Sequence, residues 1–242
     1  MASVLTQRMP RDRIFYAAVP VVVAALVFAG FARSWFLRPF MEQAPGFPEL
    51  TPLIAFHGMV FTGWISLNVL QPMLISSGRR NLHRRIGPWA AGLAALIVVL
   101  VPVITVQSMR HGGSPVFRQI HVFLAVNLIS IFAFGLCVAL AIIWRKRAET
   151  HKRLMLLALV PFLGPALGRI PAMEPLIPLG LIMGINLPII AGIAFDLITR
   201  RRVHPVWIWG GSLMILSEFA SFAIGTLPWW RAFGNWCMQL PI

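Results

Sequence analysis

The sequence predicts an all-α integral membrane protein with seven transmembrane helices, arranged as one helix followed by three helical hairpins with cytoplasmic turns. Three observations predict this fold class. Hydrophobic residues make up 58% of the 242-residue chain, and a mean hydropathy of +0.80 lies outside the range of soluble globular proteins. The hydrophobic residues form runs of about 20, the length that crosses a bilayer. The basic residues gather in short segments between these runs.

Several predicted spans contain proline, and the expected effect on the helix depends on the position of the proline within the span. Pro88 falls in the first turn of the third span, where proline is tolerated. Pro161 and Pro165 lie inside the fifth span and predict a bend there, and Pro188 lies inside the sixth. In chain order, the predicted spans are residues 14–37, 52–75, 86–108, 119–144, 154–170, 176–198 and 205–228.

Two short tails flank the predicted transmembrane domain of residues 14–228, and no loop is long enough to form a soluble domain. Residues 1–13 are a basic tail, and the apolar run after them is too long for a typical signal peptide, so we interpret it as a retained helix. Residues 229–242 form an outer tail, in which Trp229, Trp230 and Trp236 suit the membrane–water interface.

The formal net charge of +14 would suggest nucleic-acid binding in a soluble protein. Here the basic residues stand beside apolar spans, where they determine membrane topology, so we do not expect a nucleic-acid partner. Because the side with more basic residues is cytoplasmic, we expect a multi-pass protein of the bacterial inner membrane, with its N-terminus inside and its C-terminus outside. The fifteen inner basic residues are Arg8, Arg11, Arg13, Arg79, Arg80, Arg84, Arg85, Arg145, Lys146, Arg147, Lys152, Arg153, Arg200, Arg201 and Arg202, against six outside.

Histidine recurs at matching positions in this arrangement. Residues 52–90 and 117–155 share a pattern in which one histidine lies near the outer end of a span and a second follows in the next basic turn. The third basic turn repeats only the inner part of this pattern. The outer histidines are His57 and His121, and the inner ones are His83, His151 and His204.

The histidine pairs are the candidate metal ligands. Imidazole binds haem iron, zinc and copper, and two histidines from two helices at one depth could hold one metal. At about 1.5 Å per residue, His57 lies roughly 10 Å outward of the middle of its span, and His83 roughly 20 Å inward. The hydrocarbon half-thickness is about 15 Å. We therefore expect His57 and His121 to be the stronger pair; hydrogen-bonded interface histidines are the alternative.

The inner histidines stand beside arginine. Arg84, Arg85 and Arg153 could hold haem propionates, another anion or a lipid headgroup next to His83 and His151. The same residues could equally serve membrane topology alone. An inner metal or anion site, separate from the outer one, is therefore a second hypothesis.

One face of the second span is polar. Lipid cannot hydrogen-bond such groups, so this face must contact protein or a water-filled cavity. Contacts between helices and the wall of a cofactor or substrate site both remain open. The face follows one helical stripe and consists of His57, Phe61, Trp64, Asn68 and Gln71.

Glu218 is the one carboxylate well inside a predicted span, with Ser221 one turn away. It could relay protons or hydrogen-bond a neighbouring helix. Asp196 lies close to a basic turn, and we expect it to pair with Arg200 four residues later. Hydrolase, P-loop, HExxH and dinucleotide-binding motifs do not occur in the sequence.

The motifs resemble those of a group of bacterial polytopic membrane proteins of unassigned function, over about residues 31–230. The His-Lys-Arg-Leu-Met element is also similar to one in small membrane proteins implicated in cytochrome oxidase maturation. More distantly, the paired histidines resemble those of b-type cytochromes of the ferric-reductase kind, which implies haem ligation by His57 with His121 and by His83 with His151. The motifs are His57-Gly58, Trp64, Gln71, His83-Arg84-Arg85-Ile86-Gly87, His151-Lys152-Arg153-Leu154-Met155 and Asp196 followed by Arg202-Val203-His204-Pro205.

Three functions follow from these observations as hypotheses. The first is binding of haem or a transition metal (copper, iron or zinc) through paired histidines, in redox or cofactor handling. The second is a non-catalytic accessory or assembly subunit of a larger membrane complex. The third is a small-molecule or proton transporter that uses Glu218 and the polar stripe. The sequence does not decide whether the protein is an enzyme.

Overall fold

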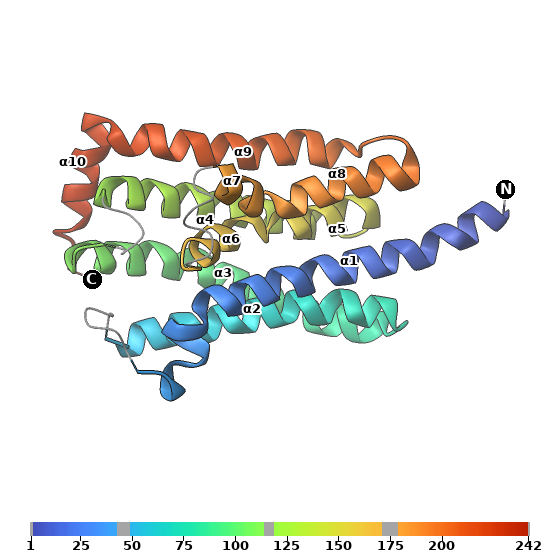
Figure 1. Cartoon of the computed structure of the whole chain (residues 1–242), viewed down its shortest axis with the longest axis horizontal. Coiled ribbons are helices and arrows are strands. Elements are labelled where there is room, and N and C mark those ends of the chain that lie inside the picture. The colour runs from blue at the N-terminus through green and yellow to red at the C-terminus, as the bar shows by residue number, and fades with distance from the viewer. Residues whose placement is uncertain (1, 43–48, 114–118, 171–178, 242) are drawn as a thin grey trace.

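A computed structural model describes residues 2–42, 49–113, 119–170 and 179–241, and within these ranges the chain is helical with short connections and no strand. Figure 1 shows the long helices lying side by side, with α10 folded across one end. The helices are α1 (Ala2–Phe31), α2 (Pro52–Ser76), α3 (Arg80–Arg110), α4 (Ile120–Ile143), α5 (Ala148–Leu157), α6 (Val160–Leu167), α7 (Leu179–Ile185), α8 (Leu187–Arg200), α9 (Pro205–Thr226) and α10 (Pro228–Cys237), with a π-helical turn at Ala32–Phe36 and a 3-10 turn at Arg38–Phe40.

Five helices of the described ranges are long and apolar enough to cross a membrane. They are Arg11–Phe36, which joins α1 to the π-helical turn, together with α2, α3, α4 and α9. The all-α membrane fold is confirmed at this level. The predicted tail at residues 1–13 is helical from Ala2 onward as part of α1, and the apolar span begins at Arg11. The third span also begins early, at Arg80, so Pro88 lies inside α3 instead of in its first turn.

The two remaining predicted spans are each divided into two shorter helices. The fifth is split between α5 and α6, and the sixth is split at Asn186 between α7 and α8. Pro161 and Pro188 lie in the first turns of α6 and α8. Proline cannot donate the helical hydrogen bond and disfavours helix in the residue before it, so a new helix begins at each. Seven continuous spans are therefore not confirmed, and residues 176–178 of the sixth lie outside the described part.

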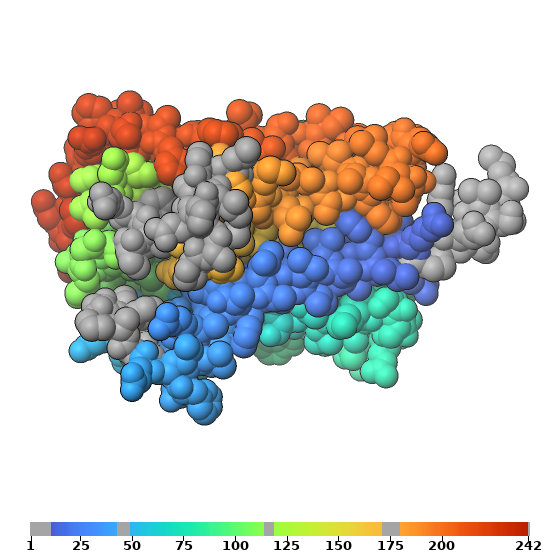
Figure 2. Space-filling view, viewed as in Figure 1, coloured from blue at the N-terminus to red at the C-terminus, as the bar shows by residue number. Residues whose placement is uncertain are grey.

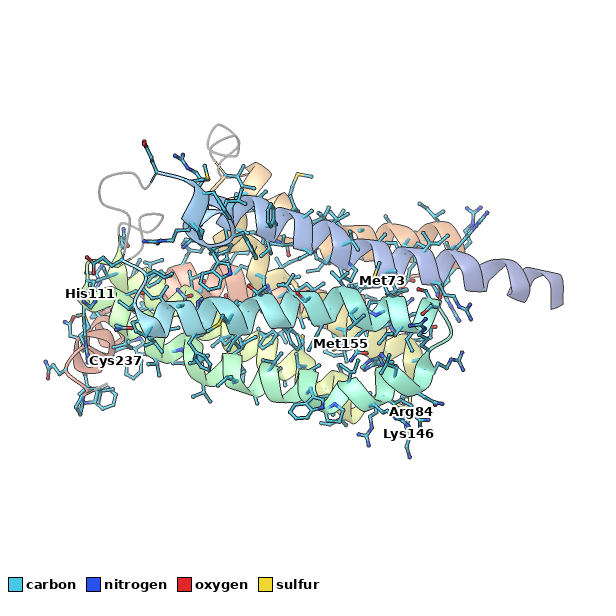
Figure 3. The ribbon with its side chains drawn as sticks, turned by 90° about the horizontal axis from the view of Figure 1, so that it is seen from below. Met73, Arg84, His111, Lys146, Met155 and Cys237 are labelled. Carbon is cyan, nitrogen blue, oxygen red and sulfur yellow. The ribbon has the colours of Figure 1, made fainter. Side chains whose placement is uncertain are left out.

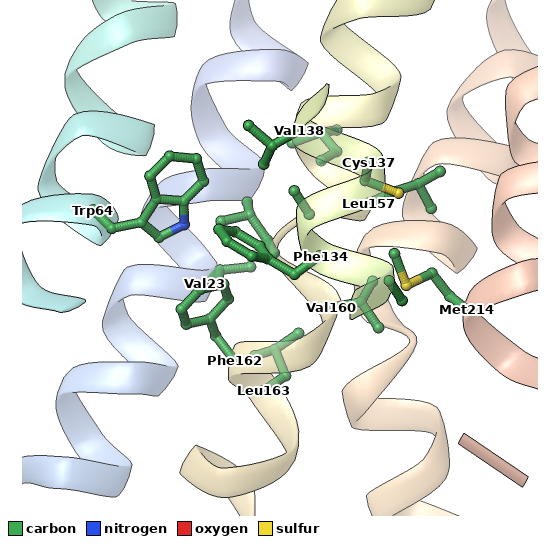
Figure 4. Close-up of a cluster of buried hydrophobic side chains, with 14 of the residues drawn as sticks. Val23, Trp64, Phe134, Cys137, Val138, Leu157, Val160, Phe162, Leu163 and Met214 are labelled. Atoms are coloured by element: carbon green, nitrogen blue, oxygen red, sulfur yellow. The ribbon is translucent and has the colours of Figure 1, made fainter. Parts of the chain in front are cut away.

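The apolar core takes buried side chains from α1–α6, α8 and α9, and Figure 4 shows its central side chains. The Trp64 and Phe134 rings meet edge to face with centroids 5.1 Å apart, and Phe134 meets Phe162 in the same way at 5.4 Å. Close packing of this kind matters in a membrane, because lipid is as apolar as the side chains and burial alone does not favour association of helices.

The turns rich in basic residues lie at one end of the molecule, which we call the basic end. It comprises the α2–α3, α4–α5 and α8–α9 connections. Figure 3 shows Arg84 and Lys146 at this end and His111 and Cys237 at the opposite end. In Figure 2, the side chains of α8 lie against those of α1 near the basic end. The N-terminal part of the chain is therefore held against the α8–α9 turn, far from it in sequence.

Candidate functional site

A network of charged side chains joins three helices, α1, α5 and α8, at the basic end. Its centre is the pair Arg153 of α5 and Asp196 of α8, whose side chains are both 0% exposed. The Arg153 Nε donates to Asp196 Oδ2 at 3.1 Å, and its Nη2 donates to Asp196 Oδ1. The remaining nitrogen, Nη1, donates to Glu149 Oε2 at 2.7 Å. The guanidinium group is therefore fully engaged by two carboxylates, in the bidentate geometry that arginine favours.

The rest of the network surrounds this buried pair. Arg200 Nη1 donates to Asp196 Oδ1 at 2.8 Å, so the predicted pair of these two residues is confirmed. Arg200 also donates to Asp12 of α1 at 2.6 Å, and Lys152 reaches both Asp12 at 2.8 Å and Glu149 at 2.7 Å. Three cations thus face three anions, which is the balance that permits burial of charge.

Glu149 shows how strongly the network favours ionised groups. Burial by itself would raise the pKa of its carboxyl group, but hydrogen bonds and charge interactions with Lys152 and Arg153 lower the pKa to about 2. The carboxylate is half exposed, so its contribution to stability is screened by solvent. The network is therefore internally satisfied, and Arg153, a predicted ligand for an anion or propionate, is already occupied by protein carboxylates.

His204, a predicted metal ligand, instead begins α9. Its Nδ1 accepts a hydrogen bond from the Val206 backbone N–H at 3.2 Å, which makes it the N-cap. Its own backbone N–H donates to Asp196 Oδ2 at 3.2 Å. Burial and then the charge of Arg153 lower the pKa of His204, and Arg200 acts in the same direction, against the opposing charges of Asp196 and Glu149. The neutral ring that the cap requires is thus favoured.

The inner histidines His83 and His151 lie next to each other. Their ring centroids are 6.3 Å apart and the ring planes are perpendicular, at 89°. His151 Nδ1 lies 2.9 Å from the Ala141 carbonyl oxygen, which is consistent with a donated hydrogen bond and leaves Nε2 with a lone pair. The Nδ1 of His83 is buried without a hydrogen-bond partner. Two imidazole nitrogens are therefore available in one small region.

The outer histidines lie against different elements. His57 of α2 contacts Phe61, with ring centroids 4.1 Å apart, whereas His121 Nε2 lies 2.9 Å from Asn235 Oδ1 of α10. Trp230 of α10 donates to the His121 carbonyl oxygen at 2.9 Å. Among the described residues, no contact joins His57 to His121, and each ring lies against a different neighbour. No group of three or more histidine, cysteine, aspartate or glutamate residues in the described ranges could hold a metal.

The polar stripe of α2 faces protein along its middle part. Trp64 and Asn68 are buried, and the Asn68 Nδ2 donates to the Trp64 carbonyl oxygen of the same helix at 2.9 Å. Trp64 Nε1 and Gln71 Oε1 are buried without a hydrogen-bond partner. The backbone of Gln71 lies beside the His83 ring. The inner end of the stripe thus belongs to the same region as the His83–His151 pair.

Glu218 of α9 meets the break between α7 and α8. The Asn186 Nδ2 donates to Glu218 Oε2 at 2.9 Å, and Ser221 Oγ donates to the Glu218 carbonyl oxygen at 2.6 Å. Two further oxygens, Asn186 Oδ1 and Glu218 Oε1, are buried without a partner. The sequence singled out Glu218 and suggested only a packing contact for Asn186, although a polar residue two positions before Pro188 was a usable signal for a helix break.

Comparisons with known proteins give no relationship for this chain: no protein-family model matches it, and neither a curated protein nor a solved structure is similar to it at a significant level.

Proposed function

We propose that the protein is an integral membrane protein that binds a single Cu(I) ion between His83 and His151, for redox chemistry or metal handling. The observation that carries this proposal is the 6.3 Å separation and perpendicular arrangement of two imidazoles from separate helices. An ion about 2 Å from one nitrogen of each ring would hold the ring centroids roughly 6 Å apart. The buried, unpartnered Nδ1 of His83 fits such a ligand.

Charge and ligand type favour monovalent copper. Arg84 and Arg85 directly follow His83, and Lys152 and Arg153 directly follow His151. Carboxylates of the network neutralise Lys152 and Arg153, but no ion pair of Arg84 or Arg85 is found among the described residues. A monovalent ion therefore binds beside these two arginines at a lower electrostatic cost than Zn²⁺ or Fe²⁺. Met155 stands one turn after His151 on the same face of α5, and Figure 3 shows it toward the basic end. Thioether and imidazole ligands together suit Cu(I).

The proposal includes the orientation of the chain. The basic end lies on the cytoplasmic side, since basic residues remain inside. We further propose that α5 with α6, and α7 with α8, complete seven crossings as discontinuous helices, which makes three hairpins with cytoplasmic turns after the first helix. Discontinuous helices are accommodated where they are buried in protein, as α6 is. The copper site would then lie close to the cytoplasmic surface.

Metal titration of the purified protein tests the proposal. Cu(I) supplied with a competing chelator should bind at one equivalent, and the double variant His83→Ala/His151→Ala should lose that equivalent. The matched control is His57→Ala/His121→Ala, which removes two histidines that do not contact each other and should retain copper. Retention of copper by the first variant would refute the assignment. An absorption spectrum with a Soret band would instead assign haem to the chain.

A further inference from the structure

The break between α7 and α8 carries a second polar site, independent of the proposed copper site. α7 ends at Ile185, α8 begins at Leu187, and Asn186 lies between them. Asn186 is 5% exposed. Its amide nitrogen donates both to the Ile182 carbonyl oxygen at 3.0 Å and to Glu218 Oε2 at 2.9 Å. One side chain thus ties the end of α7 to the middle of α9.

Two side-chain oxygens at this break lack donors, and one backbone carbonyl lacks its regular helical donor. Asn186 Oδ1 and Glu218 Oε1 are buried without a hydrogen-bond partner. Pro188 stands four residues after Gly184 and has no N–H, so the Gly184 carbonyl cannot receive the regular helical hydrogen bond. Such unpaired acceptors in an apolar environment need a cation or a hydrogen-bond donor.

Glu218 has no cationic partner among the described residues. None of the ion pairs of the network at the basic end includes Glu218. Within the part of the chain that the structure describes, Asn186 is the polar side chain that contacts the Glu218 carboxyl group. An isolated charge within a membrane span is costly, so the carboxyl group requires a positive charge from elsewhere.

An apolar contact separates this site from the ion-pair network. Along α8, Gly192 lies between Asn186 and Asp196, and the Trp207 ring of α9 packs onto it. A Cβ atom at position 192 would lie 2.1 Å from Trp207 Cζ2. Trp207 is fully buried, so the indole closes the space between α8 and α9. The arginines of the network therefore do not supply the missing charge.

We propose that Glu218 and Asn186 form a proton-binding site, in which Glu218 holds an exchangeable proton on Oε1 beside the unpartnered oxygens of the helix break. A proton suits the site because one O–H group neutralises the carboxylate and supplies the missing donor. A sodium ion would require more oxygen ligands than the three at the break. Unwound backbone carbonyls and helix ends at broken helices bind coupling ions in membrane transporters, so this site could couple proton movement to a transport step.

Infrared spectroscopy of the purified protein tests this site, because the chain has only seven aspartate and glutamate side chains. At neutral pH, the wild type should show a protonated-carboxyl band that Glu218→Gln removes. The exposed Glu42→Gln is the matched control and should leave the band unchanged. Asn186→Ala keeps the carboxyl group but removes a hydrogen-bond donor, so the same band should remain and move in frequency.

Two further outcomes decide the proposal. Transfer of the wild type into D₂O should shift the Glu218 band, because an exchangeable proton is replaced by deuterium. A neutral-pH spectrum in which Glu218→Gln removes no protonated-carboxyl band would overturn the proposal. A Glu218 band that does not shift in D₂O would also overturn the proposal, because it would indicate a proton that does not exchange with solvent. Loss of the band on addition of NaCl, but not of choline chloride, would assign the site to sodium instead.

Discussion

Substitution of Asp196 by asparagine tests the central role of the buried ion pair. Asp196 accepts hydrogen bonds from Arg153, Arg200 and the His204 backbone N–H. Asparagine keeps the shape but removes the charge, so Arg153 remains fully buried with Glu149 as its only carboxylate partner. Loss of one partner of a buried pair costs about 3–5 kcal/mol. We expect Asp196→Asn to lower the free energy of unfolding by an amount near the lower end of this range, because Glu149 still neutralises part of the Arg153 charge.

The free energy of unfolding can be measured by titration with sodium dodecyl sulfate in mixed micelles, followed by tryptophan fluorescence. Lys152→Met is the matched control, since it removes a charge of the same network whose side chain is 21% exposed. It should cost less than about 1 kcal/mol. The double variant Arg153→Met/Asp196→Leu should be more stable than Asp196→Asn, because it leaves neither member of the pair alone. An equal decrease in the free energy of unfolding for Asp196→Asn and Lys152→Met would refute the central role of the buried Arg153–Asp196 pair.

Two further predictions concern α8 and α9. The pKa of His204 is lowered in the folded protein, so its contribution to stability is complete above the unfolded value of about 6.5 and declines as the pH falls below it. Melting temperatures should show this decline for the wild type and a smaller one for His204→Asn, which keeps a cap that does not titrate. Gly192→Ala should lower the unfolding free energy by about 1–3 kcal/mol by displacing Trp207, whereas Gly87→Ala, where a Cβ meets nothing within 4 Å, should not lower it. Equal melting temperatures for the two alanine variants would contradict this account of the close contact.

Local rules predicted the interactions that lie within one helix. Asp196 and Arg200 are four residues apart, and their pairing follows from helical geometry alone. The pairing of Arg153 with Asp196 joins residues 43 positions apart and depends on how α5 packs against α8. Sequence reasoning therefore identified Arg153 as a cation available to a ligand, whereas the structure gives it two protein carboxylates.

The histidine repeat indicated where each histidine lies along its helix, but it did not indicate which histidines contact each other. His57 and His121 occupy equivalent positions in the repeat and were estimated to lie at the same depth in the membrane. The sequence therefore favoured them as a pair of metal ligands. In the structure, His121 contacts α10, a segment that the sequence presented as an interfacial tail rich in tryptophan. This short helix packs on α4 and engages His121 through Asn235, while Trp230 binds the backbone beneath it. Such docking of a terminal helix cannot be derived from the spacing of histidines.

The polar chemistry of this chain is concentrated in the helices that proline interrupts. Arg153 and His151 lie on α5, while Asn186 directly precedes α8 and Asp196 lies one turn before its last residue. A continuous helix satisfies its own backbone and offers the membrane an apolar surface. A broken helix exposes carbonyls and orients side chains at its new ends, and it persists in lipid only where other helices cover it. The long helices α2, α3, α4 and α9 therefore cover α5–α8 and allow these shorter helices to be irregular. Both proposed sites include essential residues from the irregular helices.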